Sequence, residues 1–257
     1  MRLLILPLLL AACSRPPDAP ENLEEISAWI FTHHGDEEPA ALSQALDNLG
    51  PLLNANVDAV REGFQVVGLP QEAVEALSPD EVHTAAGILG VSTALLSAFP
   101  LDDNAYAQLA VDQALIHPDT YLAYARDYQG DADAFLAHQD ERLSTFEQVT
   151  VSLPLGGELE HRTSNQQRWI DTQWGPALVQ RSWLPERGEA NYEWLEVDEQ
   201  YYVNLFLPVE GGVWHLQTSW MVNDQDLIPD ATLLSQMVDL MYDLAEGLEG
   251  WLAGPTR

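Results

Sequence analysis

The sequence predicts an α+β protein: a helical N-terminal half, an antiparallel sheet of about five strands, and a long C-terminal helix packed on that sheet. From residue 21 to about 146, apolar residues recur at steps of three and four, the period of amphipathic helices. From about residue 147 the period becomes two, and it returns to the helical period near residue 230. We expect 21–146, mainly helical, and 147–257 to form one body, since 46% of the chain is hydrophobic and can fill a core.

Several helices are expected in the first half. Leu23, Ile26 and Ile30 form the first apolar stripe, and a second helix begins near Pro39 and ends at Gly50-Pro51, where proline removes a helical donor. Ser78-Pro79-Asp80-Glu81 fits a capping box that starts another helix. Further helices are predicted for Ala105–Ile116, Asp119–Tyr128 and Asp131–Phe146.

The strand-rich part contains one clear hairpin, from Tyr201 to Val222 around Gly211-Gly212. A two-residue loop at these glycines pairs Tyr201 with Val222 and Leu207 with Leu216, and gathers the apolar residues on one face. Shorter strands are predicted at Val149–Leu153, Trp169–Trp174, Ala177–Leu184 and Tyr192–Val197, with a turn at Pro154–Gly157.

The last predicted element is a helix capped by Asp230, with an apolar stripe that runs from Leu233 to Leu252 and includes Leu244. Such a stripe has to be buried, and the hairpin offers a partner. We expect the helix to cover the hairpin face that carries Val203, Leu205, Leu207, Leu216 and Trp220.

The N-terminus has a basic residue, Arg2, and an apolar run to Leu10 that is too short to span a bilayer. The run ends in Leu10-Ala11-Ala12-Cys13, which resembles the lipobox of bacterial lipoproteins. The resemblance implies that residues 1–12 are a removed signal peptide, that Cys13 carries palmitate-type acyl chains, and that 13–20 form a Pro-rich tether. The alternatives are an ordinary signal peptide with a chance cysteine, or a buried N-terminal strand.

The lipoprotein interpretation also implies a location. Ser14, rather than aspartate, follows the cysteine, which implies the periplasmic side of the outer membrane; the alternative is the outer face of the inner membrane. The bilayer is then a partner through acylated Cys13. A single cysteine allows no intramolecular disulfide, and a formal net charge of -31 excludes nucleic acid as a partner.

Two further resemblances concern the globular part. Antiparallel strands followed by one long C-terminal helix are similar to the helix-grip (START-like) fold, which implies an enclosed apolar ligand. His117-Pro118-Asp119-Thr120-Tyr121 and Gly175-Pro176-Ala177-Leu178 resemble segments of uncharacterised acidic lipoproteins of myxobacteria-like organisms, which implies no function.

Two groups of residues and two single histidines are candidates for chemistry. His33-His34 with Asp36, Glu37 and Glu38 has metal-ligand residue types, but adjacent histidines at a helix end point in different directions, so we expect no metal site. Asp127–Asp133 lacks the ligand order of a calcium loop and is expected to be a helix break and cap. His161 and His215 are expected on exposed strand faces, with a catalytic role as the alternative.

Tryptophan is concentrated in the strands, with six of eight between Trp169 and Trp220. We expect these rings in the sheet core; the alternatives are a ligand pocket or an exposed contact face. The chain has no nucleophile elbow, phosphate loop or dinucleotide motif, so no catalytic, cofactor or metal residue is predicted.

These observations favour an envelope lipoprotein that faces the periplasm and acts as a binding or interaction module, with an apolar ligand or another envelope protein as the partner. The first alternative is a structural subunit that docks onto another envelope protein. The second is a hydrolase with dispersed catalytic residues.

Overall fold

The computed structural model describes residues 18–77, 87–88, 90–153, 157–191, 196–222 and 230–254. Its helices are α1 (Leu23–His33), α2 (Ala40–Ala55), α3 (Val57–Glu62), α4 (Gln71–Glu75), α5 (Leu101–Ala110), α6 (Gln113–Ile116), α7 (Ala132–Leu136) and α8 (Asp230–Leu252). Its strands are β1 (Phe64–Val66), β2 (Gly90–Ser97), β3 (Tyr121–Tyr128), β4 (Arg142–Leu153), β5 (Gly157–Thr172), β6 (Gly175–Trp183), β7 (Gly188–Ala190), β8 (Glu196–Val197), β9 (Glu199–Val209) and β10 (Gly212–Val222).

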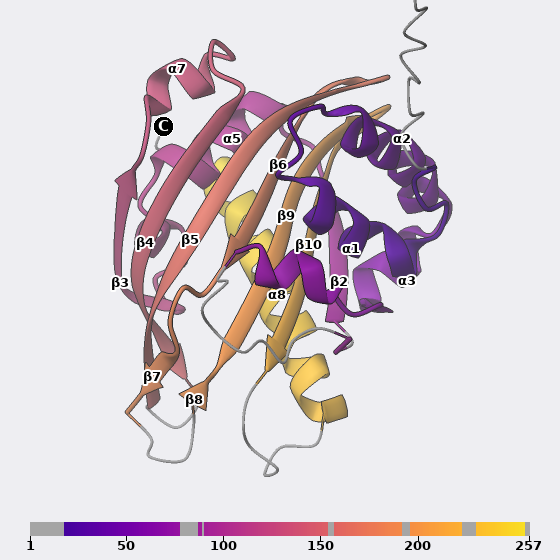
Figure 1. Ribbon diagram of the computed structural model, residues 1–257. Helices are drawn as coiled ribbons and strands as arrows, with labels where there is room; N and C mark the ends of the chain where they lie inside the picture. The colour runs from indigo at the N-terminus through magenta and orange to yellow at the C-terminus, as the bar shows by residue number, and fades with distance from the viewer. Residues whose placement is uncertain are drawn as a thin grey trace, which may run out of the picture.

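Within these residues, the ten strands form one antiparallel sheet, twice the number expected. The order is β1-β2-β10-β9-β6-β5-β4-β3, and β7 pairs with β5 and β8. Helices lie on both sides of the sheet: α1–α3 on one side, and α8 with α5 on the other (Figure 1). None of the helices in the described residues is long and apolar enough to cross a membrane.

The hairpin between β9 and β10 is confirmed, but its predicted register is wrong by two residues. Tyr201 faces Trp220 and Leu207 faces Trp214, because the turn is Glu210-Gly211, with Gly211 at φ +100°. A left-handed residue is needed at that place, and glycine adopts it without strain. A shift by two residues keeps the same side chains on each face, so the predicted grouping survives.

The predicted end of α2 at Gly50-Pro51 is wrong, because the helix continues to Ala55 with Pro51 inside it. Pro51 has no N–H for the carbonyl of Asp47, four residues earlier. The side-chain amide of Gln173, in the β5–β6 turn, donates to this carbonyl at 3.3 Å. A contact from a distant part of the chain therefore supplies the hydrogen bond that the proline removes.

The helices predicted at Asp119–Tyr128 and over the second half of Asp131–Phe146 are wrong, since these segments hold β3 and the start of β4. Tyr121, Tyr124 and Tyr128 have helical spacing. In the structure, an irregularity between Tyr121 and Ala123 shifts the pairing, so that Tyr121 faces Val151. The irregularity in the strand thus places Tyr121 and Tyr124 three residues apart, a spacing that looks like one turn of a helix.

Other parts of the predicted helical half also differ. β1 and β2 lie in it, whereas α1, α6 and α7 fall inside predicted helices. The single helix predicted at Ala105–Ile116 is wrong, since α5 begins at Leu101 and ends at Ala110, and α6 follows it as a separate helix. The capping box at Ser78–Glu81 and most of the Tyr192–Val197 strand and of the Pro154–Gly157 turn lie outside the described residues.

The apolar face of the hairpin is covered by the N-terminal helices and not by α8. Trp214, Leu216 and Trp220 are buried there against Phe31 of α1 and Leu46 of α2. We name this the outer face. The prediction that α8 packs on the sheet is confirmed, but the predicted face is wrong.

The C-terminal helix α8 lies on the opposite face, which we name the inner face. Met237 and Met241 pack with Val91 of β2, and Leu248 and Leu252 pack with residues of α5. The buried stripe consists of Met237, Met241, Ala245, Leu248 and Leu252. Leu244 is half-buried at its edge, and the side chain of Leu233 lies outside the described residues.

Candidate functional site: the polar inner face

Two rows of polar side chains cross the inner face from strand to strand. Paired residues of an antiparallel sheet share a face, so the register defines the rows. One row is Gln167, Gln180, Asn204 and Gln217, and the next is Thr145, Asn165, Ser182, Tyr202 and Ser219. We name these nine residues the polar belt. Helices cover both sides of this sheet, so an apolar inner face would be the ordinary arrangement.

Most side chains of the polar belt form hydrogen bonds with one another or with neighbouring elements. The amide of Asn165 donates to Thr145 Oγ1 at 3.2 Å, and that of Gln180 donates to Ser182 Oγ at 2.9 Å. Gln167 also donates to Thr145, but its own amide oxygen is buried without a partner among the described residues. Gln217 donates to the Met241 carbonyl of α8 at 2.7 Å. Belt side chains thus join β4, β5 and β6, and a separate bond joins β10 to the terminal helix.

An apolar cluster closes the inner face on one side of the belt. It holds Leu143, Trp169, Leu178, Phe206 and Val213 of the sheet, packed with Leu109 of α5, Phe135 of α7 and Leu248 of α8. We name it the apolar plug. It lies toward the end of β5 that is marked by Thr172.

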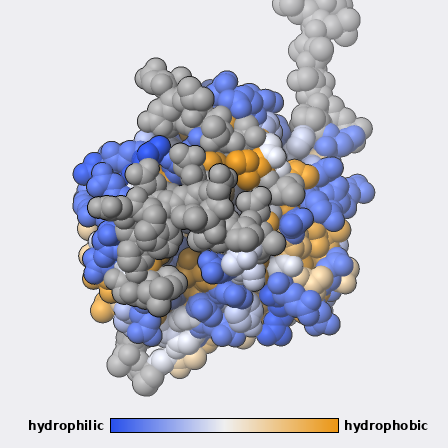
Figure 2. Space-filling model, turned by 90° about the horizontal axis from the view of Figure 1, so that it is seen from below, coloured by the Kyte–Doolittle hydropathy of each residue, from blue (hydrophilic) through white to orange (hydrophobic). Residues whose placement is uncertain are grey.

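A second apolar cluster lies beyond the belt, toward the Gly157 end of β5. Leu159, Leu184 and Val197 are buried in it, and Val151, Leu153, Ala190 and Met221 pack against them. We name it the far-end cluster. Figure 2 views the molecule from this end, where β7 and β8 lie, and shows hydrophobic surface between hydrophilic patches. From plug to far end, the inner face is apolar, then polar, then apolar.

Several belt side chains retain contact with solvent. Gln180, Tyr202 and Asn204 are partly exposed, although β6 and β9 are flanked by strands on both edges and α8 lies on their inner side. Their neighbours on the outer face, Val179, Val203 and Leu205, are fully buried. The inner face is therefore incompletely covered at the belt.

Two histidines border the belt. His215 is only 5% exposed, which corrects the expected exposed position. Its ring stacks on Phe206 at 4.3 Å, and its Nε2 lies 2.8 Å from Asn204 Oδ1. Burial lowers the pKa of His215 to about 3, with a further effect from His117, and burial lowers the pKa of His117 to about 4. Both rings are therefore neutral near pH 7.

His161 and three tyrosines complete the inner surface. His161 is half-buried on the inner face, which corrects the expected exposed position, and burial lowers its pKa to about 4. Burial raises the pKa of Tyr121, Tyr124 and Tyr202 far above the usual range. Tyr202 belongs to the belt, and the other three side chains add neutral hydroxyl and imidazole groups beside it.

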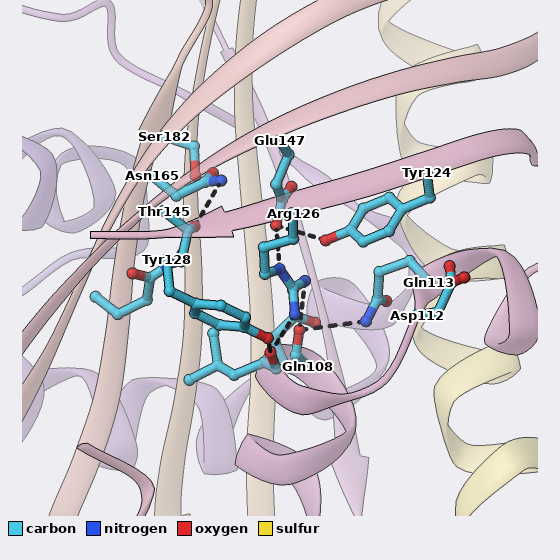
Figure 3. Close-up of polar contacts among 12 residues, drawn as sticks. Gln108, Asp112, Gln113, Tyr124, Arg126, Tyr128, Thr145, Glu147, Asn165 and Ser182 are labelled. Atoms are coloured by element: carbon cyan, nitrogen blue, oxygen red, sulfur yellow. Dashed lines mark hydrogen bonds and ion pairs between the residues drawn. The ribbon is translucent and has the colours of Figure 1, made fainter. Parts of the chain in front are cut away.

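The charged groups beside the belt neutralise one another (Figure 3). Arg126 Nε donates to Glu147 Oε1 at 2.9 Å, and Tyr124 Oη donates to the same oxygen at 2.6 Å. The guanidinium also donates to the carbonyls of Gln108 and Leu109 at the end of α5. A cation at a helix C-terminus is stabilised there. Arg126 and Glu147 thus hold α5 on the sheet and leave no net charge.

A separate groove of about 500 Å³ lies at the plug end, between the start of α2 and the loop after α7. His138 lines it, at φ +56°, and stacks on Trp169 at 4.0 Å. Its Nε2 lies 3.2 Å from Asp102 Oδ1. Gln139 donates to the Ala134 carbonyl, so His138 occupies the left-handed position that ends α7. These contacts explain its strained backbone as part of a helix end.

The sequence-predicted metal candidates do not come together. His33 Nδ1 contacts Asp36 Oδ2 at 2.8 Å, whereas buried His34 turns to the Val179 carbonyl. The different directions expected for the two rings are confirmed. Within the described residues, no group of three histidines, cysteines or carboxylates is arranged for a metal ion. Asp131 caps α7 as predicted, and Asp127 lies on β3.

The tryptophans of the strands belong mainly to the core. Trp214 and Trp220 are fully buried, Trp169 lies in the plug, and Trp174 and Trp183 pack against the outer-face core. Trp194 and Cys13 lie outside the described residues.

Sequence reasoning missed the belt, although its signal was present. Tyr202 and Asn204 alternate with apolar residues along β9, as Gln217 and Ser219 do along β10. Alternation is typical of a sheet with one face in water. Only the position of α8 and α5 shows that the polar face is covered.

No protein-family model matches this chain, and no curated protein sequence matches it. The chain is similar in structure to the protein TTHA0849 from Thermus thermophilus, with 18% identity, 65% of this chain and 99% of that chain covered, and a TM-score of 0.43. It is also similar to the lipid transfer and protein localization domain of human StarD13, with 11% identity, 80% of this chain and 96% of that chain covered, and a TM-score of 0.43. A third similar structure is a fragment of a STAR-related lipid transfer protein from Xanthomonas axonopodis, with 15% identity, 65% of this chain and 85% of that chain covered, and a TM-score of 0.41. Proteins of the START type are thus among those that this chain is similar to.

Proposed function

We propose that this chain is an envelope lipoprotein that binds a small molecule on the inner face of its sheet. In this proposal Cys13 is acylated and the body faces the periplasm, from the outer membrane or, as the alternative, from the outer face of the inner membrane. The lipobox-like Leu10-Ala11-Ala12-Cys13 supports the anchor.

The observation that carries the binding role is the partial exposure of Gln180, Tyr202 and Asn204 in the middle of the sheet. A buried polar group without a hydrogen-bond partner costs free energy, so polar groups persist in an interior when something satisfies them. Gln167 Oε1 has no partner among the described residues. A bound molecule with hydrogen-bonding groups satisfies such a surface.

The binding role is tested by blocking the inner face. We expect Asn204→Trp to abolish binding of the fluorescent probe N-phenyl-1-naphthylamine, because the indole fills the space over the belt. Gln148→Trp is the matched control, because Gln148 is exposed on the outer face of β4. Equal binding by both variants, or no binding by the parent protein, contradicts the proposal.

The anchor is tested separately. We expect Cys13→Ala to release the protein from the membrane fraction or to leave it uncleaved. The variant has no cysteine to acylate, so it lacks the acyl chains that would bind the bilayer. Mass spectrometry of the parent protein checks the modification directly. An unmodified Cys13 in membrane-extracted protein contradicts this part of the proposal.

Docking onto another envelope protein is the second candidate. Leu115 of α6 is 70% exposed and Leu122 of β3 is 51% exposed, and β3 ends the strand order of the sheet. A terminal strand with exposed leucines favours contact with a partner. Leu115→Asp with Leu122→Asp would then weaken assembly in the envelope without lowering ligand binding.

A further inference from the structure

We propose that Met221 is a site of sulfoxidation, and that its oxidation by a peroxide releases the first half of α8 from the sheet. This inference goes beyond the proposed function and does not depend on it, because it concerns the contact between two elements of the fold and no bound molecule.

The methionines of this chain are concentrated at one contact. Apart from Met1, the sequence contains only Met221, Met237 and Met241. Met237 and Met241 lie one turn apart on α8 and form a cluster with Val91 of β2, and Met221 of β10 packs against that cluster. The outer-face core and the apolar plug contain no methionine among the described residues. An oxidant that is selective for thioethers therefore acts on this contact and leaves the other two clusters unchanged.

Met221 is the most accessible of these three methionines. It lies near the end of β10 and is partly exposed, whereas Met237 is 7% and Met241 is 4% exposed. Alternate residues of a strand share a face, so Met221 is on the same face as Ser219, which pairs with Val91. Met221 also packs against the far-end cluster. One thioether is therefore within reach of solvent and in contact with the buried side chains that hold α8.

The reaction is a two-electron oxidation of this thioether. The sulfur attacks one oxygen of hydrogen peroxide, the O–O bond breaks and an S–O bond forms, so that methionine becomes methionine sulfoxide and the peroxide is reduced to water. The sulfoxide is polar, whereas Met221 packs on the apolar side chains of two clusters. A polar group among apolar side chains that offer no hydrogen bond lowers the stability of their packing.

The two halves of α8 are held by different contacts. The first half packs on β2 and β10 through Met237 and Met241, and the Met241 carbonyl accepts a hydrogen bond from Gln217 at 2.7 Å. The second half lies in the apolar plug through Leu248 and Leu252. Oxidation of the methionine contact therefore loosens the first half of the helix, and the second half stays packed.

The first test measures which methionine reacts. The full-length protein is treated with hydrogen peroxide, and peptide mapping by mass spectrometry gives the oxidation rate of each methionine. We expect Met221 to react roughly tenfold faster than Met237 and Met241, because its sulfur is the more accessible. Equal rates for the three residues overturn the assignment of the site.

The second test measures local opening by amide hydrogen exchange in protein oxidised at Met221. We expect residues 234–243 to exchange roughly tenfold faster than in the untreated protein. Residues 245–252 and the helix α2 should change by less than about twofold, since their contacts contain no methionine. Equal acceleration in both halves of α8, or no acceleration, overturns the release of the first half.

A conservative variant separates this site from general oxidative damage. Met221→Leu keeps an apolar side chain of similar volume and removes the sulfur, so the contact remains and the reaction is lost. We expect the variant to keep slow exchange in residues 234–243 under the treatment that opens the parent protein. Faster exchange in Met221→Leu at the rate of the parent overturns the proposal.

A reversal experiment needs no substitution. Methionine sulfoxide reductases return both epimers of the sulfoxide to methionine. Their action on the oxidised parent protein should restore slow exchange in residues 234–243. Exchange that stays fast after the Met221 sulfoxide has been reduced also overturns the proposal.

Discussion

Single residues hold the distant parts of this chain together. Gly50 in the middle of α2 lies against the indole of Trp174, from the turn between β5 and β6. A Cβ built on Gly50 would approach the Trp174 ring to 2.7 Å, closer than two carbons normally lie. The same turn supplies Gln173, which bonds to Asp47 beside Pro51. Gly50 and Pro51, which were predicted to end α2, therefore lie where the β5–β6 turn packs on this helix.

This contact predicts an unusual effect of alanine. Glycine-to-alanine exchange inside a helix ordinarily gains up to about 1 kcal/mol of stability. We expect Gly50→Ala instead to lose about 1–3 kcal/mol, because the new methyl group overpacks against Trp174. Gly250→Ala is the matched control, since its Cβ would meet nothing within 4 Å. Denaturant unfolding measures both, and a gain of stability for Gly50→Ala contradicts the contact.

The buried histidines predict a dependence of stability on pH. Burial lowers the pKa of His34 and His215 to about 3, compared with about 6.5 in the unfolded chain. Below pH 6.5 the unfolded state therefore binds more protons than the folded state. Protonation favours unfolding, so the free energy of unfolding falls as the pH drops from 6.5 toward 3. Each histidine contributes a slope of at most about 1.4 kcal/mol per pH unit. We expect His215→Gln to reduce the loss of stability between pH 7 and pH 5. An unchanged slope would contradict the neutral, buried state of His215.

At the scale of elements, the two sides of the terminal helix contribute differently to the stability of the fold. Leu248 is 2% exposed in the apolar plug, whereas Leu240, two turns earlier, is 46% exposed. Truncation of a core leucine leaves a cavity, but truncation of an exposed one removes little contact. The stripe that matters begins at Met237 and passes through Met241 and Ala245 to Leu252.

The helix prediction follows from these positions. We expect Leu248→Ala to lower the free energy of unfolding by about 2–5 kcal/mol and Leu240→Ala by less than about 1 kcal/mol. Leu244→Ala should fall between them, because Leu244 is half-buried. Urea unfolding of the three variants gives the order. Equal midpoints for Leu248→Ala and the parent would show that α8 is not part of the core.

At the scale of the whole molecule, the short distance along the chain from Cys13 to the body would limit how the body sits on a membrane if Cys13 is acylated. Ala19 is buried, and the amide of Asn48 in α2 holds the carbonyls of Ala19 and Pro20. From Cys13 to Ala19 the chain spans at most about 20 Å. Gln173 and Asp47 join α2 to the Thr172 end of β5. The Gly157 end of this 16-residue strand lies roughly 50 Å along it.

If Cys13 is acylated, this geometry predicts that the far-end cluster opens away from the anchoring bilayer. An added cysteine is the only free thiol in the lipidated protein, so a fluorophore can be placed at one site. We expect lipid-borne quenchers to quench a label at Glu21→Cys strongly and one at Glu158→Cys hardly at all. Both residues are exposed, so labelling should not disturb the core. Strong quenching at Glu158→Cys would show that the body lies flat on the bilayer.

Local patterns determined the elements that have one continuous apolar face. The stripe of Leu23, Ile26 and Ile30 predicted α1, and alternation around one turn predicted the β9–β10 hairpin with its apolar face. The long stripe near the C-terminus predicted α8. These elements follow from spacing alone, because each buries one face whatever covers it.

The tertiary structure decided what covers each face. Spacing shows that Trp214 and Trp220 share a buried face, but α1 and α2 and not α8 cover it, and this depends on contacts across more than 150 residues. A long-range contact also lets α2 continue through Pro51, whereas the tyrosines of 121–128 form a strand by pairing with the next strand, β4. Long-range packing converted the polar alternation of Tyr202, Asn204 and Gln217 from a surface into a belt beneath α8. Local periodicity records that a side chain is polar, whereas only the packing of distant elements decides whether that side chain meets water, a helix or a ligand.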